Sequence, residues 1–165
     1  MEIREAIYQL APFIGFPRTG NAVATIDEVF RDRGIPLPLP AQGTVPDADR
    51  YDKGLAVQAP LYGDEIKDDL ADLPGPFNEV VPRFLTEFCF GDFYSRSGLT
   101  LAQRELLVLC ALAAIGDTAA QLGPHGRACI QVGNSKNAVI AALVHCYPYI
   151  GFPRAVAAIR AVKNL

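Results

Sequence analysis

One stretch of this 165-residue chain, residues 87–127, contains a group of candidate side chains that can exchange protons or bind anions. They are Glu87, Asp92, Tyr94, Arg96, Arg104, Glu105, His125 and Arg127. Carboxylates and an imidazole can serve as general acids and bases, and guanidinium groups bind anions. The stretch therefore predicts acid–base or anion-binding chemistry.

Arg104 and Glu105 belong to an otherwise apolar segment, 101–115, in which they are the only charged residues. If this helix faces the core, at least one of them must be partly buried, and a buried charge needs a partner. Alternatively, both lie on a solvated first turn, where a glutamate favours the helix N-terminus. The sequence leaves both interpretations open.

His125 is one of only two histidines and follows Gly123-Pro124. A helix that restarts after this proline would place the imidazole near its amino end. The alternative is a core histidine that is satisfied by a backbone carbonyl. The other histidine, His145, is a weaker candidate, and we expect a packing role for it.

These candidates must be positioned by helices. Apolar spacing and stop signals predict helices at 2–14, 17–30, 51–62, 63–73, 77–89, 101–115, 118–132, 135–149 and 153–164. The helix at 77–89 should bury one face, and Thr100 and Gly116 should cap the helix at 101–115. No segment alternates like a strand, so we expect an all-α fold.

The octapeptide Ala11-Pro-Phe-Ile-Gly-Phe-Pro-Arg18 recurs as Tyr147-Pro-Tyr-Ile-Gly-Phe-Pro-Arg154. Only the second copy has a long helical region directly before it. Residues 1–31 therefore read as a half repeat, a helical hairpin packed on one full repeat. The proline-rich stretch 32–49 is an extended connector, and 50–165 form the main domain. Phe16 and Phe152 occupy equivalent positions and are expected in core or interface packing.

Composition narrows the class of partner. The formal charge of −3 and scattered basic residues argue against nucleic acid. No secretory pattern and no apolar run of about 20 residues is present, so we expect a cytoplasmic protein without a membrane partner. The four cysteines are widely spaced and have apolar neighbours, which favours buried thiols over a disulfide or a metal site.

Several spaced motifs resemble the carboxymuconolactone decarboxylase family, within the alkylhydroperoxidase-D-like superfamily. They are Arg50-Tyr-Asp-Lys-Gly-Leu-Ala-Val57, Thr86-Glu-Phe-Cys-Phe-Gly-Asp-Phe-Tyr-Ser-Arg-Ser-Gly-Leu99, Arg104-Glu-Leu-Leu107, Ala111-Leu-Ala-Ala-Ile-Gly116, His125-Gly-Arg-Ala128 with Gly133, and the ending Tyr149 to Pro153. The match covers about residues 50–165. The resemblance implies an alkylhydroperoxidase-D-like helical subunit that assembles into homo-oligomers, commonly trimers or hexamers.

The family contains two chemistries. The redox branch, the alkylhydroperoxidase-D-like proteins, uses a Cys-x-x-Cys motif. Its two cysteines lie seven and four residues before the histidine that His125 matches, and this chain has Thr118 and Gln121 at those positions. Redox activity is therefore not expected unless Cys110 or Cys129 has been recruited. The decarboxylase branch usually has a glutamate at the position of Gln121 and a proline at that of Ser97.

The resemblance implies a carboxy-lyase of the 4-carboxymuconolactone decarboxylase type, as in aromatic degradation, which acts on a small acidic substrate without a cofactor. On that basis His125 is the candidate proton donor or oxyanion partner, with Glu87 or Glu105 orienting it. The residues expected to bind substrate are Arg96, Arg104, Arg127, Tyr94 and Gln121. The second hypothesis is a non-catalytic helical oligomeric subunit, and the third is a thiol-dependent peroxidase.

Overall fold

The computed structural model describes residues 1–165, and all of its regular secondary structure is helical. The α-helices are α1 Glu2–Gln9, α2 Ala11–Ile14, α3 Phe16–Asp32, α4 Arg50–Tyr62, α5 Glu65–Asp69, α6 Phe77–Phe84, α7 Leu101–Ile115, α8 Ala119–Gln131, α9 Lys136–Ile150 and α10 Phe152–Val162. A 3₁₀ turn, η1 Asp47–Asp49, precedes α4, and a π-helix, η2 Leu85–Tyr94, follows α6. The predicted all-α class is confirmed. None of these helices is long and apolar enough to cross a bilayer.

The chain forms two compact units. The first contains residues 1–8 and 20–98, and the second contains 9–19 and 99–165. Residues 9–19 of the N-terminal helical region thus belong to the same unit as the C-terminal helices. Each unit is described by itself below.

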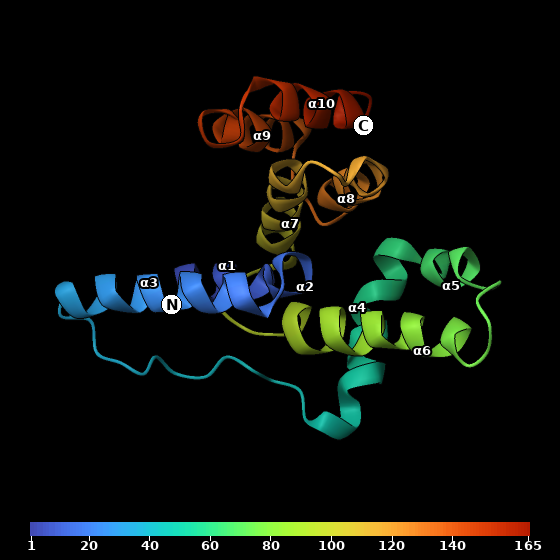
Figure 1. Ribbon diagram of the computed structural model, residues 1–165, viewed down its shortest axis with the longest axis horizontal. Coiled ribbons are helices and arrows are strands. Elements are labelled where there is room, and N and C mark those ends of the chain that lie inside the picture. Colours follow the sequence, from blue (N-terminus) through green and yellow to red (C-terminus); the bar gives the residue numbers. More distant parts are fainter. The chain divides into compact units, whose positions relative to one another are not determined.

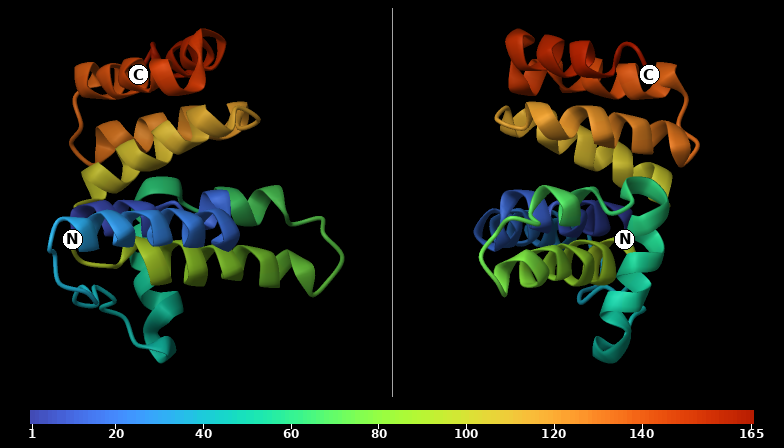
Figure 2. Two further views of the ribbon diagram at one scale, coloured as in Figure 1. Left: turned by 60° about the vertical axis from the view of Figure 1, so that its left-hand side comes forward. Right: turned by 90° about the vertical axis from the view of Figure 1, so that its right-hand side faces the viewer.

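The second unit is built around α7. Its start is fixed by a capping box, in which Thr100 accepts from the Gln103 amide and the Gln103 side chain accepts from the Thr100 amide. Its end is fixed by Gly116 in the left-handed region. Helices α8 and α9 pack against α7, and α10 lies beside α9 (Figures 1 and 2). Val108, Leu109 and Leu112 of α7 form the buried centre.

The repeated octapeptide has the same backbone in both copies. Gly15 and Gly151 end α2 and α9 with nearly identical angles, φ 79°, ψ 158° and φ 80°, ψ 156°. The next helix begins at Phe16 or Phe152, and a proline is its second residue. Phe16 and Phe152 are both 65% exposed, so core packing of these rings, one of the two expected roles, is wrong, and interface packing stays a prediction. Both rings follow a turn that carries them to the surface.

In the first unit, α4 packs closely against η2, because Gly54 and Gly91 leave room for the facing backbone. Figure 2 shows α4 crossing the α6–η2 rod. The predicted helix at 77–89 exists as α6 and continues as a π-helix to Tyr94. Its expected buried face is wrong at Phe77, Val81 and Phe84, which are all exposed. The main packing partner, α4, contacts η2 instead.

Candidate functional site

Helix α7 carries Arg104 and Glu105 into the interior of the protein. Both side chains are completely buried. The alternative in which they lie on a solvated first turn is therefore wrong. The Thr100 cap fixes where the helix begins, and with it the face on which residues four and five positions later lie. Burial of two neighbouring charges demands nearby partners.

Glu105 contacts His125 on the adjacent helix α8. The distance from His125 Nδ1 to Glu105 Oε2 is 3.0 Å, and the two side chains are 13% and 0% exposed. Helix α8 runs through Pro124 without restarting, so His125 is in the middle of the helix rather than at its amino end. A carboxylate held against Nδ1 fixes the orientation of the ring and favours a proton on that nitrogen. Proton exchange with a substrate would then use the second ring nitrogen, Nε2.

Two residues of the N-terminal half repeat join this site, and the sequence did not single them out. Arg104 Nη1 donates a hydrogen bond to Gln9 Oε1 at 2.7 Å, and Gln9 is fully buried. The Phe13 ring meets the His125 ring edge-on, with centroids 6.0 Å apart. The spacing of Gln9 and Phe13 predicts that they share a helix face, because residues four apart lie on one side of a helix. The spacing does not show that this face contacts Arg104 and His125, which lie far away in the sequence.

Two cysteines of this unit, Cys110 and Cys129, are poor nucleophiles. Burial, together with the charge of Glu105, raises the pKa of the Cys129 thiol to about 12. Burial and the neighbouring Cys146 raise the pKa of Cys110 to about 12 as well. Thiolate, the reactive form, is therefore scarce at neutral pH.

The remaining predicted residues of α8 lie on its surface. Gln121 is exposed, one turn before His125 and on the same face. Arg127 is also exposed, but two positions after His125, which places it on a different face. The structure thus pairs Glu105 with His125 and buries Arg104, the neighbour of Glu105 in the sequence, but it does not place Arg127 beside the imidazole.

The other three predicted residues belong to the first unit. Glu87 accepts a hydrogen bond from Arg83 at 2.7 Å, and buried Tyr94 packs against Phe90. Arg96 makes a two-pronged ion pair with Glu5, at 2.7 and 2.8 Å, which raises the pKa of the guanidinium. The arginine predicted to grip a substrate carboxylate thus already holds a carboxylate of its own chain.

The fold and the site define a small all-α protein with a buried carboxylate–imidazole pair. Residues 79–164 match the model of the carboxymuconolactone decarboxylase family, and the chain belongs to that family. It is 29% identical over 119 residues to 4-carboxymuconolactone decarboxylase from Acinetobacter baylyi, a match that spans 72% of this chain and 88% of the relative. It is 30% identical over 109 residues to nitrosuccinic acid decarboxylase npaB from Metarhizium robertsii, spanning 66% and 75%.

Proposed function

We propose that this protein decarboxylates a small carboxylated lactone or a related acid, with His125 as the proton donor. The observation that carries the proposal is the contact between His125 Nδ1 and the fully buried Glu105. A carboxylate in this position orients the ring for proton transfer. Both relatives described above are decarboxylases by name, which supports the same class of reaction.

The reaction can be written with the residues of this site. The bond between the substrate carbon and its carboxylate breaks, and carbon dioxide leaves. The electron pair moves into the conjugated lactone carbonyl, which becomes an oxyanion. His125 then delivers the proton on Nε2 to the carbon as the carbonyl reforms, while Glu105 holds the ring through Nδ1, and His125 takes up a proton from water before the next turnover. The substrate supplies its own electron acceptor, so the scheme requires no cofactor.

Positive charge near the Glu105–His125 pair would favour an anionic substrate. Arg104, next to Glu105 in the sequence and fully buried, contributes the positive charge of this unit's interior. Gln121 would reach a substrate from the same face of α8 as His125 and would donate a hydrogen bond to it. Arg96 would have to release Glu5 before it could bind a substrate carboxylate through both prongs.

The two relatives suggest which acids to test. One is named for a carboxylated lactone and the other for a nitro-substituted dicarboxylic acid. In both compounds, an electron-withdrawing group can accept the charge left by carbon dioxide. We therefore propose as substrate class a small polyanionic acid in which a departing carboxylate lies close to such a group.

The test is incubation with 4-carboxymuconolactone and, separately, nitrosuccinate, following loss of substrate and release of carbon dioxide. We expect the His125→Ala variant to lower turnover at least about 100-fold, the scale for one general acid. Glu105→Gln, which keeps the shape and removes the charge, should also lower it strongly. His145→Ala, at the exposed second histidine, is the matched control.

Equal turnover by the His125→Ala variant and the parent protein would remove this residue from the mechanism. If the parent protein turns over neither acid nor related lactones, the non-catalytic oligomeric subunit becomes the better description. The exposed aromatic side chains Tyr149 and Phe152 would suit such an assembly role. Peroxide consumption with a dithiol reductant, lost on changing Cys110 or Cys129, would instead support the peroxidase hypothesis.

A further inference from the structure

Gln9 and Phe13 lie on one face of the N-terminal helical segment. Helices α1 and α2 are separated only by Leu10, whose angles are themselves helical, and the amides of Phe13 and Ile14 both donate to the Leu10 carbonyl. Residues four apart therefore point in the same direction. This face meets α7 at Arg104 and α8 at His125.

We propose that this face is a working part of the site and that Phe13 is a positioning residue for His125. The ring of Phe13 stands edge-on to the imidazole at an interplanar angle of 78°. A packed aromatic ring limits rotation of the imidazole and keeps water from the bond between Nδ1 and Glu105. The proposal rests on the proposed function for its catalytic consequence, but the orientation of His125 can be measured without it.

Gln9 lies on the same helix face, one turn before Phe13. It provides the acceptor for Arg104 Nη1, and Arg104 adjoins Glu105 on α7. The N-terminal segment thus contacts one member of the carboxylate–imidazole pair directly and the neighbour of the other. Both contacts are made by residues outside 79–164, the part of the chain that matches the family model.

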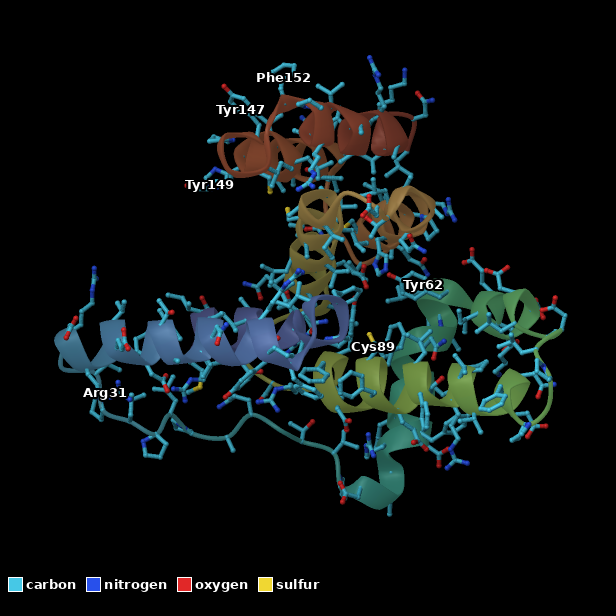
Figure 3. All side chains as sticks on the ribbon, in the orientation of Figure 1. Arg31, Tyr62, Cys89, Tyr147, Tyr149 and Phe152 are labelled. Carbon is cyan, nitrogen blue, oxygen red and sulfur yellow. The ribbon has the colours of Figure 1, made fainter.

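The repeat provides an internal comparison. Phe13 corresponds to Tyr149 and Gln9 to His145, 136 residues further along the chain. Tyr149 is 81% exposed, and it projects from the α9–α10 turn together with Tyr147 and Phe152 (Figure 3). His145 is exposed as well, whereas Gln9 is fully buried. The same backbone motif therefore contacts the site residues in one copy and is exposed to solvent in the other.

The test compares Phe13→Ala with Phe13→Tyr and with the matched control Tyr149→Ala. For Phe13→Ala we expect kcat to fall about 10- to 100-fold, the scale of a misplaced catalytic group, with a smaller change in KM. Phe13→Tyr, which keeps the ring and copies the residue of the other repeat, should restore most of kcat. Tyr149→Ala should leave both constants unchanged.

A spectroscopic readout separates positioning from activity. The hydrogen-bonded Nδ1 proton of His125, identified by its absence in His125→Ala, should give a low-field proton resonance in the parent protein. We expect exchange with water to broaden it in Phe13→Ala and not in Phe13→Tyr or Tyr149→Ala. Phe13→Leu, which retains apolar volume, serves as the second variant if Phe13→Ala does not fold.

Retention of the Nδ1 resonance and of kcat in a folded Phe13 variant would overturn the proposal. Equal effects of Phe13→Ala and Tyr149→Ala would do the same, because the two positions would then contribute only to general stability. If the parent protein shows no decarboxylation, the proposed function fails, yet the resonance still decides whether Phe13 positions His125.

Discussion

Arg104 and Glu105 are adjacent, oppositely charged and completely removed from water. Desolvation of a charge costs several kcal/mol unless good partners compensate for it. Each charge has such a partner, since Arg104 donates to Gln9 and Glu105 contacts His125. Retaining two charges where apolar residues would pack well is typical of a functional site rather than of a core built only for stability.

The thiols of the second unit provide a prediction at the same scale. Because burial raises the pKa of Cys110 and Cys129 to about 12, we expect neither to react appreciably with iodoacetamide at about pH 7.5 in the folded protein. Mass spectrometry of the labelled peptides is the measurement, and the protein unfolded in guanidinium is the control.

Rapid labelling of either thiol in the folded state would show that a thiolate is accessible, and it would reopen the peroxidase hypothesis.

The raised pKa values of Cys110 and Cys129 also affect the stability of the fold. An unfolded thiol has a pKa near 9.0, so the contribution of the buried protonated thiols is complete below that pH. It is lost as the pH rises from about 9 towards 12.

Sequence reasoning found Glu105 and His125, because charged residues on apolar helices are few in this chain. It could not choose between Glu87 and Glu105 as the partner of the histidine, since neither spacing nor residue type distinguishes them. It also could not find Gln9, which lies 95 residues before its partner Arg104. Such contacts depend on tertiary packing rather than on local pattern.

At the scale of elements, the crossing of α4 and η2 depends on two glycines. A Cβ atom on Gly54 would lie 2.2 Å from the carbonyl oxygen of Thr86, and one on Gly91 would lie 2.4 Å from that of Arg50. The crossing is further held by a hydrogen bond from Thr86 Oγ1 to Gln58 Oε1 at 2.6 Å, and by the Arg50–Asp92 ion pair. Close backbone approach leaves no space for a side chain.

We therefore expect Gly54→Ala to lower the free energy of unfolding by at least about 2 kcal/mol, the usual cost of overpacking. Denaturant titration followed by circular dichroism is the measurement. Gly20→Ala is the control, because Gly20 lies inside α3 and a Cβ atom added there would have no neighbouring atom within 4 Å. That change should raise stability by about 0.5–1 kcal/mol. Unchanged stability of Gly54→Ala would mean that the helices can separate without cost.

Helix positions were largely predictable, and the departures have physical causes. Thr100 and Gly116 cap α7 as expected, because capping depends on local hydrogen bonds. The π-helix at Leu85–Tyr94 was not predictable, since its wider turn is stabilised by packing on α4 rather than by residue preference. Periodicity also shows which helix face is apolar without showing what covers it, as α6 illustrates.

For the whole molecule, exposed apolar side chains are the feature that favours self-association. Phe77, Val81 and Phe84 form one exposed face of α6, and Tyr149 and Phe152 are exposed at the α9–α10 turn. Clusters of this kind usually mark protein–protein contacts. They support the proposal that the protein is a homo-oligomer.

We expect deletion of residues 1–30 to cause dissociation or aggregation together with a lower thermal midpoint. Deletion removes Glu5 and Gln9, the partners of Arg96 and of the fully buried Arg104, and uncovers apolar surface that the N-terminal helices bury. Sedimentation velocity and thermal unfolding of the truncated and full-length chains are the measurements. A truncated protein with the same subunit number and thermal midpoint would contradict this prediction.

The duplicated octapeptide also has a consequence for how this chain can diverge. The two copies meet different structural demands, because Phe13 contacts His125 whereas Tyr149 faces solvent. Gly15 and Gly151 remain under the same backbone constraint, since both end a helix at positive φ. Substitutions should therefore be tolerated at the exposed aromatic position of the second copy before they are tolerated at the glycine of either turn.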